Sequence, residues 1–147
     1  TNVKAQQSIH FVVGGDYNFI AWDRKFKFYS ELYYKILDNM VPYQIENIRI
    51  RYYGTNSSRG YAAGWDMRIN GEFVDGLESW FSFSLLKTDE NIEYLDANNN
   101  VQNSGLIRRP TDQRVNASVF FQDELPMNPR LKTNLFFVFG SATPYYL

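Results

Sequence analysis

The chain of 147 residues contains no cysteine and a single histidine, His10. Without cysteine it forms neither a disulfide framework nor a thiolate metal site. One histidine also excludes a histidine-rich zinc site built from this chain alone. These absences remove the commonest structural and catalytic metal sites, and the sequence predicts no cofactor.

Long apolar runs are missing too. No stretch of about 18 apolar residues is present, so a transmembrane helix is not expected. Thr1–Gln7 is polar and lacks the apolar core of a signal peptide, which indicates either that a signal has been removed or that the chain begins inside a longer protein. The net charge of -1 and the pI of about 5.8 give no basic field, so nucleic acid is not an expected partner.

Aromatic residues, by contrast, are abundant. They make up 18% of the chain, although the mean hydropathy of -0.42 is that of a water-soluble protein. A membrane β-barrel reconciles the two values, because only every second residue of its strands has to face lipid.

Apolar and polar residues alternate with a period of two along six segments, as in strands that have one apolar face. In the clearest of them the odd residues Trp65, Met67 and Ile69 are apolar, whereas Asp66 and Arg68 between them are charged. The predicted strands are Ile9–Ile20, Phe26–Leu37, Tyr61–Phe73, Ser79–Thr88, Gln113–Asp123 and Leu131–Gly140. All five prolines fall outside these segments, as expected for a residue that cannot donate to a β ladder.

The connections between these segments alternate between short and long. Bacterial outer-membrane barrels have short periplasmic turns and longer outer loops. On that rule Trp22–Lys25, Val74–Glu78 and Glu124–Arg130 are periplasmic, whereas Asp38–Gly60 and Asp89–Thr111 face outside. The first long stretch is also compatible with an extension of the preceding strand through Ile48 and Ile50.

Strand length and aromatic placement favour a membrane. Tilted membrane strands need about 9 to 11 residues, which these segments reach. Aromatic residues gather at both ends of the segments: Trp22, Phe26, Phe73 and Trp80 beside the short turns, and Tyr34, Tyr52, Tyr53 and Tyr61 toward the long loops. The predicted fold is all-β, an antiparallel transmembrane β-barrel segment. A soluble sandwich or lipocalin-like barrel is the alternative in which the aromatics fill a core.

The number of strands is too small for a closed barrel. Six or seven strands are fewer than the minimum of about 8 for a bacterial outer-membrane barrel. An unclosed edge in lipid would leave backbone groups without partners. We therefore expect residues 1–147 to be a partial outer-membrane β-barrel domain.

Several motifs, in this order, resemble late barrel strands of TonB-dependent receptors from Bacteroidetes. They are the strand Tyr61–Phe73, Glu78-Ser79-Trp80 before a strand that ends Leu86-Lys87-Thr88, and above all Arg109-Pro110-Thr111-Asp112-Gln113-Arg114-Val115-Asn116 followed by Phe120–Asp123. The resemblance covers nearly the whole chain. It implies a 22-stranded barrel in the bacterial outer membrane that imports a bulky nutrient with energy supplied through TonB. The family's N-terminal plug domain and TonB box are not recognisable here, so transport would belong to the parent protein.

Other motifs give no chemistry of their own. Asp96, Asn98 and Asn100 begin like a calcium loop, but Val101 stands where glycine is needed and Ile107 where a bidentate glutamate is needed. Gly14-Gly15 lacks the spacing of a phosphate loop. No Ser/His/Asp set is recognisable, and the sequence predicts that the chain is not an enzyme.

Polar residues of the strands are interpreted as groups that line the barrel lumen. This applies to His10, and to Asp66, Arg68 and Glu72, which share one face; a ladder of lumenal charges is favoured there over a paired-carboxylate site. Asp89-Glu90 is interpreted as a solvated charge pair in a loop.

Arginine and tyrosine in the outer loops are the candidate contact residues, because both are over-represented at recognition hot spots. Plain anchoring at the membrane interface is the alternative. The expected partners are outer-membrane lipid and lipopolysaccharide, the rest of the barrel, TonB through an N-terminal region, and a surface lipoprotein. A receptor-like barrel that scaffolds an outer-membrane complex without transport is the rival function. The candidate residues are Arg49, Arg51, Tyr52, Tyr53, Arg59, Arg108 and Arg109.

Overall fold

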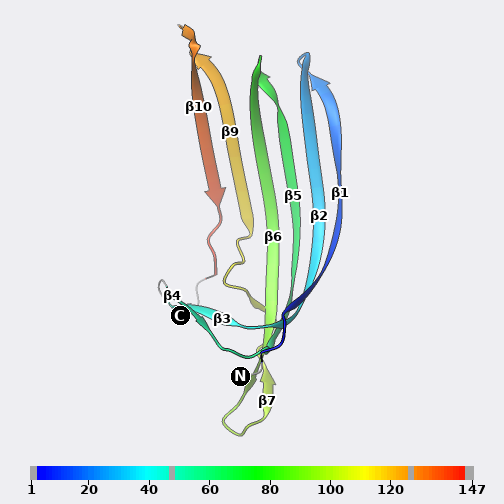
Figure 1. The fold of residues 1–147 in the computed structure, drawn as a ribbon, viewed down its shortest axis with the longest axis vertical. Helices are drawn as coiled ribbons and strands as arrows, with labels where there is room; N and C mark the ends of the chain where they lie inside the picture. The colour runs from blue at the N-terminus through cyan, green and yellow to red at the C-terminus, as the bar shows by residue number, and fades with distance from the viewer. Residues whose placement is uncertain (1–2, 47–48, 126–127, 145–147) are drawn as a thin grey trace.

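The computed structural model describes residues 3–46, 49–125 and 128–144, which form strands and no helix. Accordingly, no helix in this part of the chain is long and apolar enough to cross a membrane. Six long strands form one antiparallel sheet in the order β1-β2-β5-β6-β9-β10 (Figure 1). Their bounds are Gln7–Ala21 (β1), Arg24–Met40 (β2), Ser58–Val74 (β5), Leu77–Leu95 (β6), Val115–Leu125 (β9) and Asn128–Gly140 (β10). The six strands predicted from the alternation are thus confirmed.

The tight turns that join β1 to β2 and β5 to β6 lie at one end of the sheet, which we call the turn end, and the long connections lie at the other, the loop end (Figure 1). Ala21 pairs with Arg24 around Trp22 and Asp23, whose φ angles of 52° and 58° fit the two-residue turn that matches the twist of a hairpin. Val74 pairs with Leu77 around the predicted Asp75-Gly76 turn. Of the third predicted turn, Glu124–Arg130, residues 126–127 lie outside the described residues.

The loop end carries four short strands. β3 (Tyr43–Glu46) and β4 (Arg49–Tyr52) pair only with each other, as a separate ribbon. β7 (Val101–Asn103) and β8 (Ile107–Arg108) both pair with the distal part of β6.

Two sequence-based boundaries are therefore wrong. The strand after Phe26 does not continue through Ile50: Asn39 has a φ of 53° and the pairing shifts between Leu37 and Met40, so β2 ends before Pro42. Ile48 lies outside the described residues. The stretch Asp89–Thr111 is not simply a loop, because β6 runs on to Leu95 against β7 and β8.

One proline also departs from its predicted place. Pro129 lies within the bounds of β10, where the register shifts between Asn128 and Lys132. Because β10 is an edge strand and its start is irregular, the missing N–H there does not interrupt a regular ladder.

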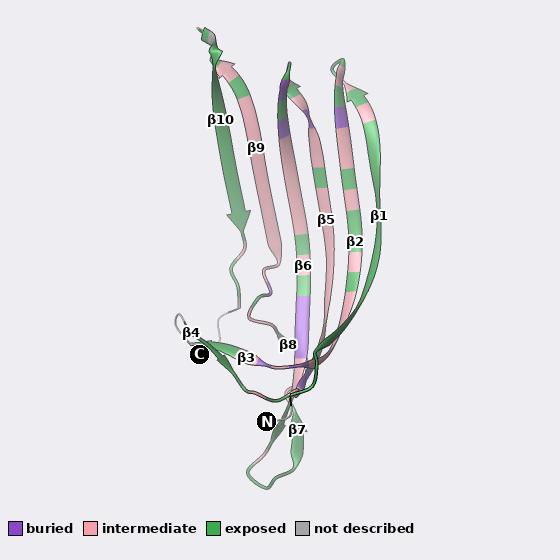
Figure 2. Cartoon of the chain, in the orientation of Figure 1, coloured by how far each residue is buried: buried purple, intermediate pink, exposed green. Residues whose placement is uncertain are grey.

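The sheet is a single layer and is not closed into a barrel. β1 and β10 are its two edges, and both are mostly exposed (Figure 2). Among the described residues the buried apolar side chains are those of Phe26, Met40, Leu77 and Pro42. The accessible surface is 10941 Å², against about 7,800 Å² expected for a compact monomer of this mass. The described part of the chain therefore forms no core of the kind that a soluble sandwich or lipocalin-like barrel would need.

Close approach of strands fixes the identity of one glycine. A Cβ on Gly60 would overlap the carbonyl oxygen of Asp89 and come within 3.1 Å of Glu90 Cα. We expect Gly60→Ala to lower the free energy of unfolding by roughly 1 to 3 kcal/mol, since both backbones have to move. Gly15→Ala is the matched control, because nothing lies within 4 Å of its Cβ position; it should be neutral or stabilising by about 0.4 to 1 kcal/mol. The free energies of unfolding of both variants can be measured with denaturant. Equal changes for Gly60→Ala and Gly15→Ala would contradict the close approach of the strands at Gly60.

Candidate functional site

The strand register brings most of the apolar side chains of the six long strands onto one face of the sheet. Val13 pairs with Leu32, Leu32 with Trp65, and Trp65 with Leu85. Leu85 in turn pairs with Val115. Further rows of the same face run across the sheet, among them Phe11, Tyr34 and Ala63; Tyr17, Phe28, Ile69, Phe81, Val119 and Phe137; and Met67, Phe83, Ala117 and Phe139. We call this surface the apolar face.

The apolar face is long in the direction of the strands and wide across the sheet. On β1 it runs from Ile9 to Phe19. Ten residue steps of about 3.3 Å make it about 33 Å long in the strand direction. With five strand spacings of about 4.8 Å, the face covers roughly 800 Å², more than the largest apolar patch of a typical soluble monomer.

Polar groups on this face are either satisfied or confined to its ends. Within the band, Ser30 Oγ accepts a 2.8 Å hydrogen bond from Trp65 Nε1, and Ser79 Oγ accepts one of 3.0 Å from the backbone N–H of Gln122. Of the side chains that the structure describes, the charged ones on this face stand near its two ends: Arg24 and Asp123 at the turn end, and Asp38, Arg59, Lys87 and Asp89 at the loop end.

Aromatic rings border the apolar face at both ends, although Trp80 of the predicted set lies on the polar face and Tyr52 lies on the β3–β4 ribbon. At the turn end the ring of Phe26 packs against those of Phe19, Trp22 and Phe73, with centroids 5.5, 5.9 and 5.1 Å away. At the loop end Tyr34 and Tyr61 stack at 5.9 Å. Such rings favour the boundary between an apolar layer and water.

The opposite face, which we call the polar face, carries the residues predicted to line a lumen. His10 lies edge-on to Tyr33 at 6.0 Å, and Asp66 pairs in register with Glu31. Glu72 does not join Asp66 in a paired site, because its Oε2 accepts a 3.0 Å hydrogen bond from the N–H of Gly76 and closes the turn. The paired-carboxylate arrangement is therefore not formed by these residues.

One part of the polar face is aromatic. Trp80 stacks on Phe120 at 6.0 Å and meets Phe136 edge-on at 6.1 Å. The guanidinium of Arg68 lies 4.9 Å from the Trp80 ring centroid, within cation–π range.

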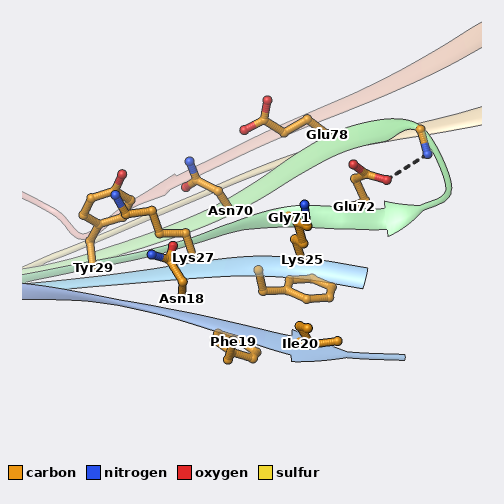
Figure 3. Close-up of a pocket in the computed structure, with 12 residues that line it drawn as sticks. Asn18, Phe19, Ile20, Lys25, Lys27, Tyr29, Asn70, Gly71, Glu72 and Glu78 are labelled. Carbon is orange, nitrogen blue, oxygen red and sulfur yellow. Dashed lines mark hydrogen bonds between the residues drawn. The ribbon is translucent and has the colours of Figure 1, made fainter. Parts of the chain in front are cut away.

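A shallow hollow of ≈ 850 Å³ lies at the turn end of the sheet (Figure 3). Lys27 forms an ion pair of 2.9 Å with Asp16 and lies 4.5 Å from the centroid of the Tyr29 ring. Asn70 Oδ1 is buried without a hydrogen-bond partner among the described residues. Both charge signs line the hollow, Lys25 and Lys27 against Glu72 and Glu78, so it favours no ligand of one sign.

A cluster of buried charges at the loop end, here the loop-end cluster, was not predicted. The carboxylates of Asp89, Glu90 and Asp112 are 7%, 3% and 1% exposed as residues. Each has a cation close by: Lys87 Nζ lies 3.5 Å and Arg114 Nη2 3.9 Å from Asp89, Arg109 Nε 3.7 Å from Glu90, and Arg114 Nε 2.6 Å from Asp112. Hydroxyls add to the cluster, since Tyr61 donates to Asp89 and Ser58 to Glu90, both at 2.7 Å.

Asp112 replaces a missing rung of the sheet. Between β8 and β9 the chain leaves the ladder, and Asp112 Oδ1 accepts a 2.8 Å hydrogen bond from the N–H of Thr88. The N–H of Arg109 donates to the carbonyl of Thr88 at 3.1 Å, and that of Leu86 donates to the carbonyl of Arg114 at 3.0 Å. The Asp112 carboxylate thus accepts the hydrogen bond that a backbone carbonyl of a neighbouring strand would otherwise accept.

The interpretation of Asp89-Glu90 as a solvated loop pair is wrong. Both residues continue β6 and are covered by Arg109 and Arg114. Those arginines lie far along the chain, so local composition gives no signal for the burial. The signal available was the motif Arg109–Asn116 itself, because its two arginines outnumber its one carboxylate, Asp112, and so call for a further carboxylate elsewhere in the chain.

The predicted contact residues do not form one site. Arg49, Arg51 and Tyr52 lie on β4, and Tyr53 follows them. Arg59 is on β5, with a 3.9 Å ion pair to Asp38, and Arg108 pairs in register with Asp89. Arg109 belongs to the loop-end cluster, where it is mostly buried and holds the segment in place.

The segment that resembles a calcium loop is a polar turn. Asp96 Oδ1 accepts hydrogen bonds from the N–H groups of Asn98 and Asn100, at 2.8 and 2.9 Å. In residues 3–46, 49–125 and 128–144 no three His, Asp or Glu side chains are arranged so that they could hold a metal ion.

The Asp96 turn should depend on pH. The hydrogen bond from the Asn100 N–H, helped by that from Asn98, lowers the pKa of Asp96 below its usual value. A lowered pKa means that the turn is fully stabilised above the unfolded pKa of about 3.9 and loses this stabilisation as the pH falls through the folded value. NMR amide shifts of residues 98 and 100 should report the loss in acid. Shifts that do not change between neutral pH and pH 2 would contradict it.

Comparison with known proteins gave no match, either to a family model, to a curated protein or to a solved structure. The features that bear on function are therefore the two faces of the sheet and the loop-end cluster.

Proposed function

We propose that this chain forms part of the wall of a β-barrel in a bacterial outer membrane. The observation that carries the proposal is the continuous apolar face, which is about 25 Å high if the strands tilt as in such barrels. A single-layer sheet with this surface would be insoluble as a free monomer, because nothing in the described residues covers its apolar side chains. Hydrocarbon would cover them, and the polar face would line a lumen.

The two edge strands support a wall that continues on both sides. Unpaired N–H and C=O groups of β1 and β10 would cost several kcal/mol each in lipid. Further strands therefore pair with both edges in the complete barrel. β1 and β10 run in opposite directions, which suits an antiparallel barrel with an even number of strands.

The resemblance to TonB-dependent receptors supports a more specific proposal, that the parent protein imports a nutrient into the periplasm. The motif that carries this resemblance, Arg109–Asn116, is also the segment that builds the loop-end cluster. In this proposal the loop end faces the outside and lipopolysaccharide, and TonB acts from the turn end through an N-terminal region. The wall itself has no catalytic role.

Single cysteines test the proposed faces, because the natural chain contains none. Val119 and Ser118 are neighbours on β9 and are both half-buried. In protein reconstituted into bilayers, Ser118→Cys should react readily with a charged, water-soluble thiol reagent, whereas Val119→Cys should be protected because thiolates do not form in hydrocarbon. Equal labelling rates of the two variants in bilayers would contradict the proposal that the apolar face contacts lipid.

A second measurement separates transport from scaffolding. If the reading frame that precedes Thr1 encodes a plug domain and a TonB box, the import function is supported. If neither is encoded, the parent is a receptor-like barrel that acts as a structural subunit.

A further inference from the structure

The ribbon formed by β3 and β4 has two chemically different faces. Tyr43 pairs with Tyr52 and Ile45 with Ile50, so these four side chains share one face, and the two tyrosine rings lie 5.8 Å apart. Ile45, Ile50 and Tyr52 are 53%, 56% and 64% exposed. Arg49 and Arg51 lie on the other face. The ribbon is therefore amphipathic, with its apolar stripe open to solvent.

No other strand in the described part of the chain contacts this ribbon. Its base is closed by a 3.0 Å hydrogen bond from the N–H of Tyr53 to the carbonyl of Pro42. The ribbon projects at the loop end of the sheet (Figure 1). Two-stranded ribbons are at best marginally stable in water, and a third strand or a packed face is what normally stabilises them.

The unpaired backbone groups at the edges of the ribbon distinguish between two kinds of partner, a lipid membrane and a protein segment. The outer edges of β3 and β4 have no strand beside them in the described residues. Insertion into lipid would leave those N–H and C=O groups without partners, which is strongly unfavourable. A protein segment that adds a strand satisfies them and covers the stripe at the same time. A protein partner is therefore favoured over the membrane.

We propose that β4 is a docking edge for an extended segment of a partner protein, in which apolar and acidic residues alternate. Both arginines of the ribbon lie on β4, so acidic side chains of an added strand stand beside Arg49 and Arg51. Its apolar side chains then extend the stripe next to Ile50 and Tyr52. This inference goes beyond the proposed function, since it holds whether or not the long strands cross a membrane.

The test uses two synthetic probes added to the full chain in detergent micelles. One is a capped peptide in which valine and isoleucine alternate with glutamate, and the other has lysine in place of every glutamate. The glutamate peptide should bind, measured by fluorescence anisotropy, and should slow amide hydrogen exchange at residues 49–52. The lysine peptide should bind about tenfold more weakly or not at all.

The double variant Arg49→Glu and Arg51→Glu should reverse this preference between the two peptides. Unchanged exchange in β5 and β6 would show that the variant is folded. Equal binding of both peptides, or binding without protection of β4, would overturn the proposal. So would attachment of the ribbon to anionic phospholipid vesicles that is lost on Ile50→Ser, since lipid would then be the partner.

Discussion

Leu32→Lys is expected to lower the stability of the protein in phospholipid bilayers by about 2 to 4 kcal/mol, the cost of a lysine at the lipid face of a barrel near mid-depth. Leu32 is in the middle of the apolar face, between Val13 and Trp65. It is 56% exposed in the free sheet, so the same change in water should fall within about 0.5 kcal/mol. The size of the effect therefore reports what covers the apolar face.

Glu31→Lys is the matched control on the neighbouring residue. Glu31 lies on the polar face opposite Asp66, where a lysine would replace a like-charge pair with an opposite-charge pair. Reversible denaturant unfolding in vesicles, followed by tryptophan fluorescence, would compare the two variants. If both were tolerated equally, the apolar face would not contact lipid.

Asp112→Ala should be the most damaging change at the loop end, with a loss of about 3 kcal/mol in the free energy of unfolding. It leaves the N–H of Thr88 without an acceptor and Arg114 without its nearest carboxylate. Asp112→Asn should recover part of the loss, because its side-chain oxygen is still able to accept from Thr88. Amide hydrogen exchange at Thr88 should be fast in the alanine variant and slower in the asparagine variant.

The control for this experiment is an exposed ion pair at the same end of the sheet. Arg59 and Asp38 are 3.9 Å apart, and their side chains are 74% and 46% exposed. Asp38→Asn should therefore cost no more than about 1 kcal/mol. If Asp38→Asn and Asp112→Ala lowered the free energy of unfolding by comparable amounts, burial would not be the reason why the loop-end cluster stabilises the fold.

The faces of the long strands were predictable because the alternation that defines them is local. Trp65, Met67 and Ile69 need only their own chain neighbours to be placed on the apolar face, and pairing in register then extends that face from strand to strand. The Asp75-Gly76 turn was predictable for the same reason, since two adjacent residues determine it.

The loop end was less predictable because its structure depends on contacts between distant residues. Glu90 is polar and follows an obvious strand, yet it is buried because Ser58 and Arg109 reach it from different parts of the chain. The β3–β4 ribbon is separate from β2 because the register of β2 shifts between Leu37 and Met40 and the strand ends there, which the apolar residues beyond Pro42 do not reveal. Closure of the sheet depends on the strands that pair with β1 and β10, and the sequences of β1 and β10 do not specify those strands.

Three tryptophans make the apolar face directly measurable. Trp65 lies on it at the level of Leu32, Trp80 lies on the polar face, and Trp22 lies in a tight turn. Variants that keep only Trp65 or only Trp80, with phenylalanine at the other two positions, should be reconstituted into vesicles whose acyl chains carry bromine, a contact quencher of tryptophan fluorescence. Strong quenching of Trp65 and little quenching of Trp80 is the predicted result. Fluorescence of Trp65 that is unaffected by brominated chains would contradict the assignment of this surface to lipid.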